Sequence, residues 1–482
     1  MKPTLDMVVS PHDRSPLPGE ALQLVQLQFQ PKQRWVPSRF NARTLGDDGR
    51  LILWNTLSGA ISVFAPEHSD AVISHLSRKG VTAPLDKVAE YLSRRGFLVA
   101  DDVNELNLFR VKYGQQQWRS DICELILLSS EDCNFRCVYC YEKFQRGTMS
   151  PDVRQGVRAM VLKRAPYLRE LGISWFGGEP LYGWEAVEEL SPFFKDVAER
   201  HNLVHHQDMT TNGYLLTEER ATKLLDWGCR TYQITIDGLP DEHNCKRVGR
   251  DGSPTYDTIL DNLRSLKCRK DSFGVIVRVN FDRDNFPRLG HFLEVLSEDF
   301  GGDPRFRLRF RGVGKWGGPN DDQLSTCGIG EHRAAVRTLR KKATEVNLSQ
   351  EGGIRDSAKP GGQVCYAARP YNFIVGATGK LMKCTVVLDT LDANVVGQLY
   401  VDGTTKLNDE YMSKWVSPYF ESDKMCQTCY MLPGCQGGTC PLTRIRYDER
   451  ECSGIKKVLK EEMRFTLAQT VSTQRAAATH AS

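Results

Sequence analysis

Three cysteines on one short stretch are the residues of this sequence best suited to chemistry. Cys133, Cys137 and Cys140 stand in a C-x3-C-x2-C spacing, directly after an apolar run at residues 125–128 that predicts a strand. Thiolates so close together can hold one face of an iron–sulfur cube. A [4Fe–4S] cluster normally takes four cysteine ligands, and the next cysteine is Cys229. The spacing therefore indicates a cluster with one iron left open to a ligand that is not protein.

A zinc site or plain buried thiols are the alternatives for these three cysteines. Zinc would require a fourth Cys or His close by, and His201 is far along the chain. The spacing alone leaves both alternatives open.

A second motif, Gly177-Gly178-Glu179-Pro180, follows another predicted strand. Two glycines allow positive φ and a close approach of the backbone to a ligand. The carboxylate of Glu179 can accept hydrogen bonds from an ammonium group. Taken alone, the motif would fit a plain corner between a strand and a helix equally well.

The elements that must position these motifs alternate between strand and helix. The predicted strands are residues 125–128, 173–176, 206–210, 232–236, 275–281 and 306–310. The helices predicted between them lie near residues 152–164, 185–200, 217–227, 255–267 and 286–298. Such βα units imply a parallel sheet that curls into a partial barrel. Its working face is the C-terminal end of the strands, where both motifs are expected.

Composition narrows the class of protein. The chain has 482 residues, too many for one compact core, and two to four domains are expected. A net charge of +4 gives no argument for a nucleic-acid partner. There is no apolar run long enough to span a membrane and no apolar signal segment at the start. Fifteen cysteines without an export signal indicate metal or redox work in a reducing, cytoplasmic compartment.

The cysteine spacing and the Gly-Gly-Glu-Pro motif together resemble the radical S-adenosylmethionine (SAM) enzymes. In that family, three cysteines hold a [4Fe–4S] cluster whose open iron binds SAM. Reduction yields methionine and a 5′-deoxyadenosyl radical, which removes a hydrogen atom from the substrate. The resemblance implies an α/β fold with a partial (β/α)6 barrel and Cys133, Cys137 and Cys140 as the cluster ligands.

The same resemblance implies a set of SAM-binding residues. The Gly-Gly-Glu-Pro motif would hold the amino group, Thr235 the ribose or carboxylate, and Arg247 the carboxylate. Asn212 and Asn280 are candidates at strand ends, and Tyr139 would lie near the adenine. Apart from the motif, each could equally be an ordinary structural residue. The cofactor-binding set is Tyr139, Gly177, Gly178, Glu179, Pro180, Asn212, Thr235 and Arg247. No catalytic base is indicated.

Seven further cysteines form a block near the C-terminus: Cys365, Cys384, Cys426, Cys429, Cys435, Cys440 and Cys452. The block resembles the SPASM extension, which holds auxiliary [4Fe–4S] clusters, and so implies three clusters in all. Four residues separate Cys435 from Cys440 where the family has three, so the loop must bulge, and two glycines permit this. Two zinc sites are the alternative, since C-x2-C also serves zinc.

The SPASM resemblance also implies a pairing of these cysteines. An outer cluster would take Cys426, Cys429, Cys435 and Cys452, and an inner cluster Cys365, Cys384 and Cys440. Some members carry a fourth inner ligand at the position of Tyr371, but no cysteine stands near it here. The inner cluster would then have an open iron or a ligand that is not cysteine.

A small domain is expected before the barrel. Residues 51–64 predict two strands about a Ser-Gly turn, followed by helices near residues 68–78 and 85–95 and a strand at residues 96–99. The pattern is winged-helix-like and similar to the peptide-recognition domain of peptide-modifying radical SAM enzymes. There, the leader of the substrate adds a strand to a sheet edge. A structural cap without a ligand is the alternative.

The predicted organisation has six parts. They are a disordered lead-in (residues 1–19), a winged-helix-like domain (20–112), a radical SAM barrel (113–313), a linker containing Cys327 and one helix (314–364), a SPASM domain (365–465) and a tail (466–482).

These features favour a radical SAM/SPASM maturase of ribosomally synthesised peptides (RiPPs). It would bind the leader of a precursor peptide, cross-link or otherwise modify side chains of its core, and receive electrons from a flavodoxin or ferredoxin. An anaerobic sulfatase-maturating, formylglycine-forming enzyme is the alternative. In those enzymes an aspartate follows the inner cysteine, whereas Thr385 follows Cys384 here. A non-catalytic iron–sulfur electron-transfer protein is a third possibility, against which the Gly-Gly-Glu-Pro motif argues.

Overall fold

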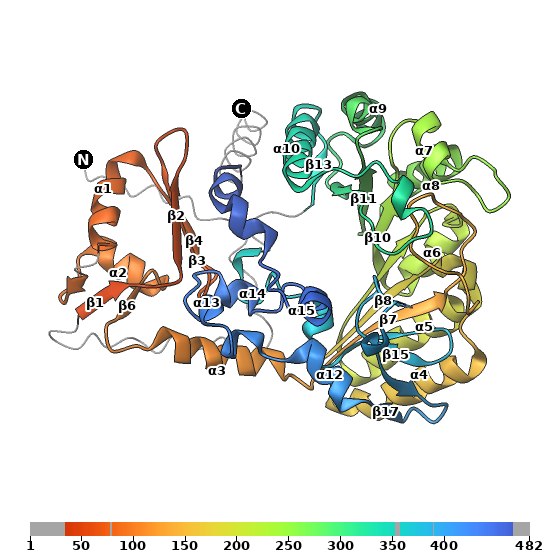
Figure 1. Ribbon diagram of the computed structural model, residues 1–482, viewed down its shortest axis with the longest axis horizontal. Helices are drawn as coiled ribbons and strands as arrows, with labels where there is room; N and C mark the ends of the chain where they lie inside the picture. Colours follow the sequence, from red (N-terminus) through yellow and green to blue (C-terminus); the bar gives the residue numbers. More distant parts are fainter. Residues whose placement is uncertain (1–33, 78–79, 352–356, 389, 466–482) are drawn as a thin grey trace. The chain divides into compact units, whose positions relative to one another are not determined.

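The computed structural model describes residues 34–77, 80–351, 357–388 and 390–465. The lead-in predicted at residues 1–19 and the tail predicted at residues 466–482 lie outside these ranges. Contacts divide the chain into two compact units, which are treated separately below (Figure 1). The first comprises residues 1–118, 352–368 and 417–482, and the second comprises residues 119–351 and 369–416. Within the described ranges, every helix is too short or too polar to cross a bilayer.

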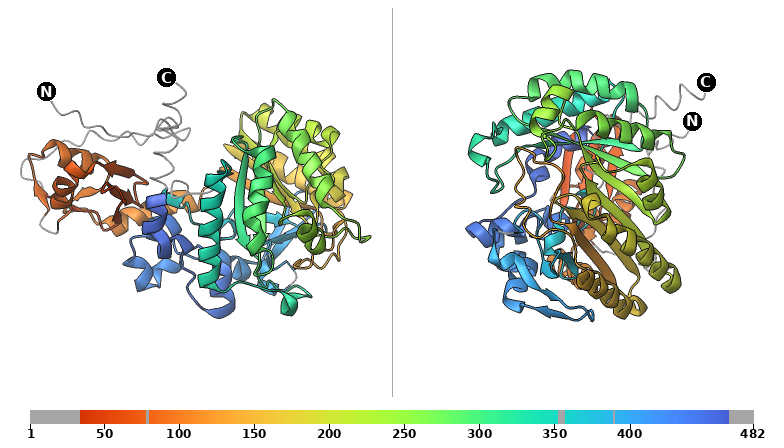
Figure 2. Two further views of the ribbon diagram at one scale, coloured as in Figure 1. Left: turned by 90° about the horizontal axis from the view of Figure 1, so that it is seen from above. Right: turned by 90° about the vertical axis from the view of Figure 1, so that its right-hand side faces the viewer.

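The second unit is built on six parallel strands. They are β7(Ile122–Ser130), β8(Glu170–Gly177), β9(Val204–Thr211), β10(Cys229–Thr235), β11(Gly274–Phe281) and β12(Phe306–Gly312), and each pairs with the next in chain order. The helices that return the chain are α4(Pro151–Arg164), α5(Trp184–His201), α6(Glu218–Asp226), α8(Tyr256–Cys268) and α9(Leu289–Phe300). Figure 2 shows these helices along the outer face of the strands. The predicted α/β fold with a parallel sheet is confirmed.

The two faces of this sheet differ in chemistry. Side chains alternate between the faces of a strand. Those on the outer face are apolar and buried beneath the helices, as Ile173 and Trp175 of β8 show. The inner face carries polar side chains instead, such as Asp208, Gln233 and Arg278. A (β/α)8 barrel fills its interior with branched aliphatic layers, so a polar inner face leaves space for a ligand.

The sheet extends beyond the six predicted strands at both edges. After β12, helix α10(Ile329–Glu345) leads to β13(Ser349–Gln350), which pairs parallel with β12 in a stretch predicted as a linker. Beside β7 lies β14(Asn372–Val375), also parallel. It continues into the antiparallel strands β15(Lys380–Met382), β16(Val395–Leu399) and β17(Thr405–Leu407), followed by α12(Asp409–Val416). These strands are too short to show a period in the sequence.

The first unit begins with two small antiparallel sheets. One contains β5(Val81–Thr82), β1(Arg34–Pro37) and β6(Leu98–Ala100), and the other contains β2(Asn41–Leu45), β3(Leu51–Asn55) and β4(Ile61–Phe64), each in that spatial order. The helices are α1(Pro66–His75), α2(Lys87–Arg94) and α3(Glu105–Gln117). The predicted hairpin at residues 51–64 and the two predicted helices are confirmed.

Strand β3 joins the N-terminal sheet to the C-terminal cysteine segment within the first unit. Leu51 and Leu53 of β3 belong to the core formed with α1 and α2. Ile52 and Trp54, on the opposite face, belong to a second core that includes Met431. The indole of Trp54 also donates a hydrogen bond of 2.9 Å to the backbone oxygen of Ala358. The N-terminal strands therefore bury part of the C-terminal segment, and neither can be removed without exposing the other.

Candidate active site

The cysteine loop after β7 is held by backbone hydrogen bonds to the end of α7(Pro240–Lys246) and to the residues just after it. The amide of Arg136 donates to the oxygen of Val248, and that of Val138 to the oxygen of Lys246, both at 2.9 Å. The loop is thus anchored to a segment distant in sequence, which fixes its backbone before any ligand binds.

The three thiols of this loop lie on one cavity, because Cys133, Cys137 and Cys140 all line it. The amide of Phe135 donates to the sulfur of Cys133 at 3.3 Å. Burial and the neighbouring Cys137 raise the pKa of the Cys140 thiol to about 12. Iron binds the thiolate, so the positive charge of a metal has to replace these protons. The donor set therefore fits a metal group.

The sulfur spacing distinguishes between a single ion and a cluster. A zinc ion with sulfur ligands at about 2.3 Å brings those sulfurs to about 3.8 Å from one another. Among the described residues, no three cysteine sulfurs lie within 4.8 Å of one another. This spacing is wider than that of three ligands of one zinc ion, and a cube, which offers each thiol its own iron, tolerates a wider spacing.

The Gly-Gly-Glu-Pro motif forms the turn after β8 and packs against the start of the cysteine loop. Gly177 has a φ of +125°, and a Cβ there would lie 2.0 Å from the oxygen of Ser130. A Cβ on Gly178 would lie 2.7 Å from the oxygen of Asp132. The amide of Gly178 donates to the Ser130 oxygen at 3.0 Å. The glycines thus admit the backbone of the cysteine loop, while the sequence indicated only an approach to a ligand.

Glu179 is fully buried, and protein donors hold its carboxylate. It accepts hydrogen bonds from the amide of Leu181 (2.9 Å), the hydroxyl of Thr211 (2.7 Å) and the amide of Asn212 (2.7 Å). Burial raises the pKa of Glu179, and these hydrogen bonds oppose the rise. A carboxylate has about four acceptor positions, so one stays open to an ammonium group. A role in holding the SAM amino group stays a prediction.

Tyr139 is the centre of a buried hydrogen-bond network in the cavity wall. Its hydroxyl donates to the carboxylate of Asp237 and accepts from Arg247 Nη1 at 2.9 Å and from Asn280 Nδ2 at 3.2 Å. The amide of Asn280 donates to the other oxygen of Asp237 at 2.8 Å. The Tyr139 hydroxyl is therefore committed to orienting charged groups, a task the sequence did not indicate.

Arg247 keeps its charge inside this network. Burial lowers the pKa of Arg247, but Tyr139, Cys137 and Asp237 raise it by a larger amount, so the net shift is upward. Its Nε has no hydrogen-bond partner among the described residues, although it is buried. A charged N–H without a partner in a cavity wall suits an anionic ligand. A SAM carboxylate is such an anion.

The structure brings most of the predicted SAM residues together. Tyr139, Gly177, Gly178, Asn212, Thr235 and Arg247 line the cavity with the three cysteines. Glu179 and Pro180 are buried behind them. The Asn212 side chain donates to Asn134 Oδ1 at 2.8 Å and lies 3.8 Å from the Cys133 sulfur. The assignment of these residues to SAM remains untested.

Sequence reasoning missed two charged residues of the cavity, Glu142 and Arg278. Glu142 Oε1 is buried without a hydrogen-bond partner in the described part of the chain. Burial and the nearby Glu131 raise the pKa of Glu142 to about 8, and Arg146 opposes the rise. The sequence could have indicated Glu142, because it stands two residues after Cys140. It could also have indicated Arg278, because that residue lies on the inward-facing side of β11.

The predicted outer cysteines meet within the first unit. Cys426 lies in α13(Lys424–Gln427) and Cys435 ends α14(Leu432–Cys435). The Cys435 thiol interacts electrostatically with Cys429 and Cys452, and the Cys426 thiol with Cys435. Their role as ligands of one cluster stays a prediction, for which this convergence is the structural support.

Donors surround the outer sulfurs. Arg444 Nη2 lies 3.8 Å from the Cys426 sulfur. Hydrogen bonds to Cys429 and Cys452 help to raise the pKa values of Lys456 and Arg450, respectively, against the effect of their partial burial. Three of the four outer cysteines thus have a cation beside them.

The backbone turns sharply after Cys435, and a bulge relative to the family's loop stays a prediction. Gln436 and Gly437 have φ values of 51° and 70°, and a Cβ on Gly437 would lie 3.1 Å from the amide nitrogen of Phe420. The amide of Cys365 donates to the oxygen of Gly438 at 3.0 Å. Glycine at position 437 is therefore required by both the backbone angle and the space.

The predicted inner set is divided between the two units. Cys365 and Cys440 belong to the first unit, with Cys440 directly before α15(Pro441–Tyr447). Cys384 belongs to the second unit, after β15, and its amide donates to Asn394 Oδ1 at 2.8 Å. The inner cluster stays a prediction. Cys327, in the predicted linker, is half-buried in the second unit.

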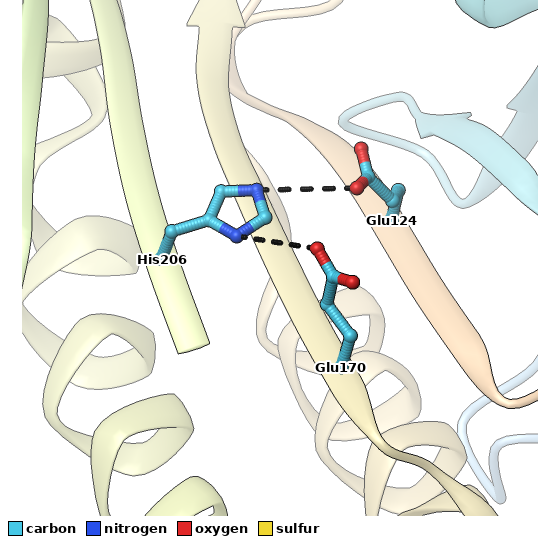
Figure 3. A group of neighbouring side chains, drawn as sticks. All are labelled: Glu124, Glu170 and His206. Carbon is cyan, nitrogen blue, oxygen red and sulfur yellow. Dashed lines mark ion pairs between the residues drawn. The ribbon is translucent and has the colours of Figure 1, made fainter. Parts of the chain in front are cut away.

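A separate polar group lies toward the start of strands β7 to β9. Figure 3 shows His206 between Glu124 and Glu170, with each imidazole nitrogen 3.9 Å from a carboxylate oxygen. Gly172 stands between them on β8, where a Cβ would lie 2.6 Å from His206 Nε2. With Asp208 on β9, this part of the inner face is acidic.

Comparison with protein families and curated proteins identifies relatives of the barrel. Residues 127–286 match the family described as the Radical SAM superfamily. The radical SAM cyclopropyl synthase TigE of Paramaledivibacter caminithermalis is 26% identical over 237 residues, 45% of this chain and 48% of that protein. A cysteine-type anaerobic sulfatase-maturating enzyme of Clostridium novyi is 25% identical over 165 residues, 32% of this chain and 43% of that protein. The chain thus spans about half the length of these relatives or less.

One solved structure is similar to this chain in fold. Native anSMEcpe with bound AdoMet and Cp18Cys peptide is similar over 74% of this chain and 99% of that chain, with a TM-score of 0.55 and 18% identity. The match to Streptococcus suis SuiB bound to precursor peptide SuiA covers 86% of this chain and 98% of the SuiB chain, with a TM-score of 0.47 and 13% identity.

The family match begins inside β7 and ends just after β11, so it includes the cysteine loop and the Gly-Gly-Glu-Pro turn. The cofactors of that family are a [4Fe–4S] cluster and SAM, and the three separated thiols and the free guanidinium N–H of Arg247 fit them. Residues 127–286 form a radical SAM domain.

Proposed function

We propose that this protein is a radical SAM enzyme that modifies side chains of a ribosomally made precursor peptide. One observation carries the proposal: the three thiols of the cysteine loop line the same cavity as polar inner-face residues of the barrel, among them Thr210 and Asn280. A substrate side chain on the inner face would therefore lie beside the site where the radical is made.

Different residues of the cavity would bind the cluster, bind SAM and exclude water. When bound, the cluster and SAM supply the radical that removes a hydrogen atom from the substrate. Cys133, Cys137 and Cys140 would hold the cluster. Arg247 would bind the SAM carboxylate through its free Nε–H, and Tyr139 and Asp237 keep its guanidinium in place. The aromatic rings of Phe144 and Trp316, which also line the cavity, would exclude water.

The first unit supports a peptide as substrate. Its sheet of β2, β3 and β4 has a free edge at β4, because only β3 pairs with that strand in the described residues. An extended leader peptide can add a strand to such an edge. The solved structure of similar fold carries a bound peptide, and the SuiB structure was solved with its precursor. The 15 free thiols suit a reducing compartment such as the cytoplasm.

Anaerobic reconstitution tests the proposal. The protein is loaded with iron and sulfide, reduced with dithionite or with flavodoxin, and given SAM together with a short peptide encoded beside its gene. We expect 5′-deoxyadenosine and a mass change on the peptide, both measured by liquid chromatography and mass spectrometry. Production of 5′-deoxyadenosine without any change in any encoded peptide would contradict the peptide assignment. No 5′-deoxyadenosine at all would contradict the radical SAM assignment.

Oxidation of a Cys or Ser to formylglycine is a second candidate. The similarity of fold to anSMEcpe over 74% of this chain favours it. In such enzymes an aspartate follows the inner cysteine, and Thr385 takes that place here. A synthetic peptide carrying a sulfatase motif decides between the two, because conversion to formylglycine gives a defined loss of mass. We expect that peptide to remain unchanged.

A further inference from the structure

Three arginines form a basic wall on the inner face of the second unit. Arg278 lies on β11, and Arg309 and Arg311 lie on β12. Arg278 is paired in register with Arg309, and Asn280 with Arg311. Since residues two apart on a strand share a face, the three guanidiniums lie together. Arg278 lines the cavity of the three thiols, and so does Gly312, which follows Arg311.

The basic wall has more positive charge than its neighbours neutralise. Arg309 is paired with Glu351, and its Nη1 donates to Gln233 Oε1 at 2.5 Å. Arg278 donates to the neutral Asn280 at 2.8 Å and interacts electrostatically with the buried Asp237. Within the described residues, no hydrogen bond or ion pair reaches the Arg311 guanidinium. In the described part of the chain, Glu351 and Asp237 are the carboxylates that interact with these three cations, and Asp237 is shared with Arg247.

This excess charge is unfavourable without a ligand. Partial burial lowers the pKa of Arg311, and the neighbouring Arg278 and Arg309 lower it further, while Glu351 opposes them. Like charges held together cost free energy, although water reaches the exposed side chain of Arg311 and screens part of the repulsion. An anion with two oxygens relieves that cost, because a guanidinium binds a carboxylate through two parallel hydrogen bonds.

Two carboxylates can reach this cavity: that of SAM and that of an acidic side chain on the substrate. The cysteine end of the cavity has its own cation, Arg247, which interacts electrostatically with Cys137. The groups that shift the pKa of Arg311 are Arg278, Arg309 and Glu351, and no cysteine is among them. Toward β7 to β9 the inner face is acidic, with Glu124 and Glu170, and would repel a second anion. A substrate carboxylate is therefore directed to β11 and β12.

We propose that the basic wall binds the carboxylate of an Asp or Glu in the substrate peptide, close to the side chain presented to the radical. This inference rests on the proposed function and adds to it a class of substrate, a peptide segment with an acidic residue near the modified one. Arg311 and Arg278 are then residues that determine specificity, while the hydrogen transfer depends on other groups.

Binding of short peptides tests this inference without any turnover. The probes are acetylated, amidated peptide libraries that differ only in a central Asp, Glu, Asn or Gln, bound to the SAM-loaded protein without reductant. We expect the acidic libraries to bind at least about tenfold more tightly, as for a charge-assisted hydrogen bond. The preference should disappear in Arg311→Gln and in the double variant with Arg278→Gln. It should persist in Arg307→Gln, which changes an arginine of the same strand and face outside the wall.

The remaining measurements separate the alternatives. In Arg311→Glu the preference for a central Asp or Glu should also be lost, and an unchanged thermal unfolding profile would show that the fold is intact. No acidic preference in the unaltered protein, or one that survives the double variant, would overturn the inference. So would a loss of SAM affinity in Arg311→Gln with peptide preference unchanged, because the carboxylate bound would then be that of SAM. Failure of the proposed function shows separately, as absence of 5′-deoxyadenosine in the reduced protein.

Discussion

The cysteine loop of the second unit and the outer cysteines of the first unit differ in what their sulfurs contact. The loop has three thiols beside a cavity, and its sulfurs are approached by neutral amides such as that of Phe135 and by one buried cation, Arg247. The outer group has four thiols, three of them beside the cations Arg444, Arg450 and Lys456. Three ligands beside a cavity suit a cluster that binds a small molecule. Four ligands among cations suit a cluster that transfers electrons, because hydrogen bonds and positive charge raise its reduction potential.

Removing the loop thiols gives the largest expected effect. In the triple variant of Cys133, Cys137 and Cys140 to Ala, 5′-deoxyadenosine formation should fall below detection. Iron content should fall from about twelve to about eight per chain, since one cube of three is lost. Iron analysis and mass spectrometry after anaerobic reconstitution measure both. SAM cleavage by the triple variant would contradict the assignment of the SAM-binding cluster to the loop thiols. A total near four irons in the unaltered protein would contradict the predicted auxiliary clusters.

Glu179 lies behind the cavity wall, next to the cysteine loop. Its replacement should have the next largest effect, a loss of SAM affinity. Glu179→Gln loses a charged acceptor that holds Thr211 and Asn212. We expect SAM to bind about thirtyfold more weakly, in line with about 2 kcal/mol for a buried hydrogen bond to a charged group. Equilibrium dialysis of SAM measures this. Glu185→Gln on α5 is the control, because Glu185 is an exposed partner of Arg154. Equal SAM affinity in both variants would argue against a role for Glu179.

Removing the Tyr139 hydroxyl should have a smaller effect on SAM binding. Tyr139→Phe removes the bond that orients Arg247 and leaves Asp237 with one donor fewer. We expect KM for SAM to rise about tenfold with little change in kcat. Tyr214→Phe is the matched control, since its ring packs edge-on against Phe135 and no described residue bonds its hydroxyl. A fall in kcat with KM unchanged would show that Tyr139 acts in the reaction and not in positioning.

Removing a cation beside the outer cysteines should have the smallest effect, a shift in the reduction potential of the outer cluster. Lys456→Met removes a positive charge that interacts with Cys429 and Cys452. We expect the outer cluster to become harder to reduce by tens of millivolts, while uncoupled SAM cleavage stays unchanged. A redox titration followed by electron paramagnetic resonance, in the triple loop variant, observes the auxiliary clusters alone. Lys457→Met, on the same helical segment, is the control. Equal potentials would mean that the cations do not distinguish the two regions.

Much of the fold was predictable because its signal is local. The strands and helices of the parallel sheet repeat at their own periods, and all six predicted strands are present. The short strands β13 to β17 were not predicted because two to five residues carry no period. The shared core of the first unit was also beyond prediction, because Trp54 and Met431 meet only in the folded chain. Removing residues 1–105 to test leader binding would therefore also uncover the C-terminal cysteine segment.

The sequence by itself predicted metal-binding cysteines in two groups and a ligand-binding turn at the Gly-Gly-Glu-Pro motif, because residue type and spacing are covalent properties of a short stretch. Only the tertiary structure decided that the glycines admit the backbone of Ser130 and Asp132, and that the Tyr139 hydroxyl joins Asp237 to Arg247. It alone collected Arg278, Arg309 and Arg311 into a wall with more cations than carboxylates. These relations join residues on different strands, and the register between strands is set by packing across the whole sheet.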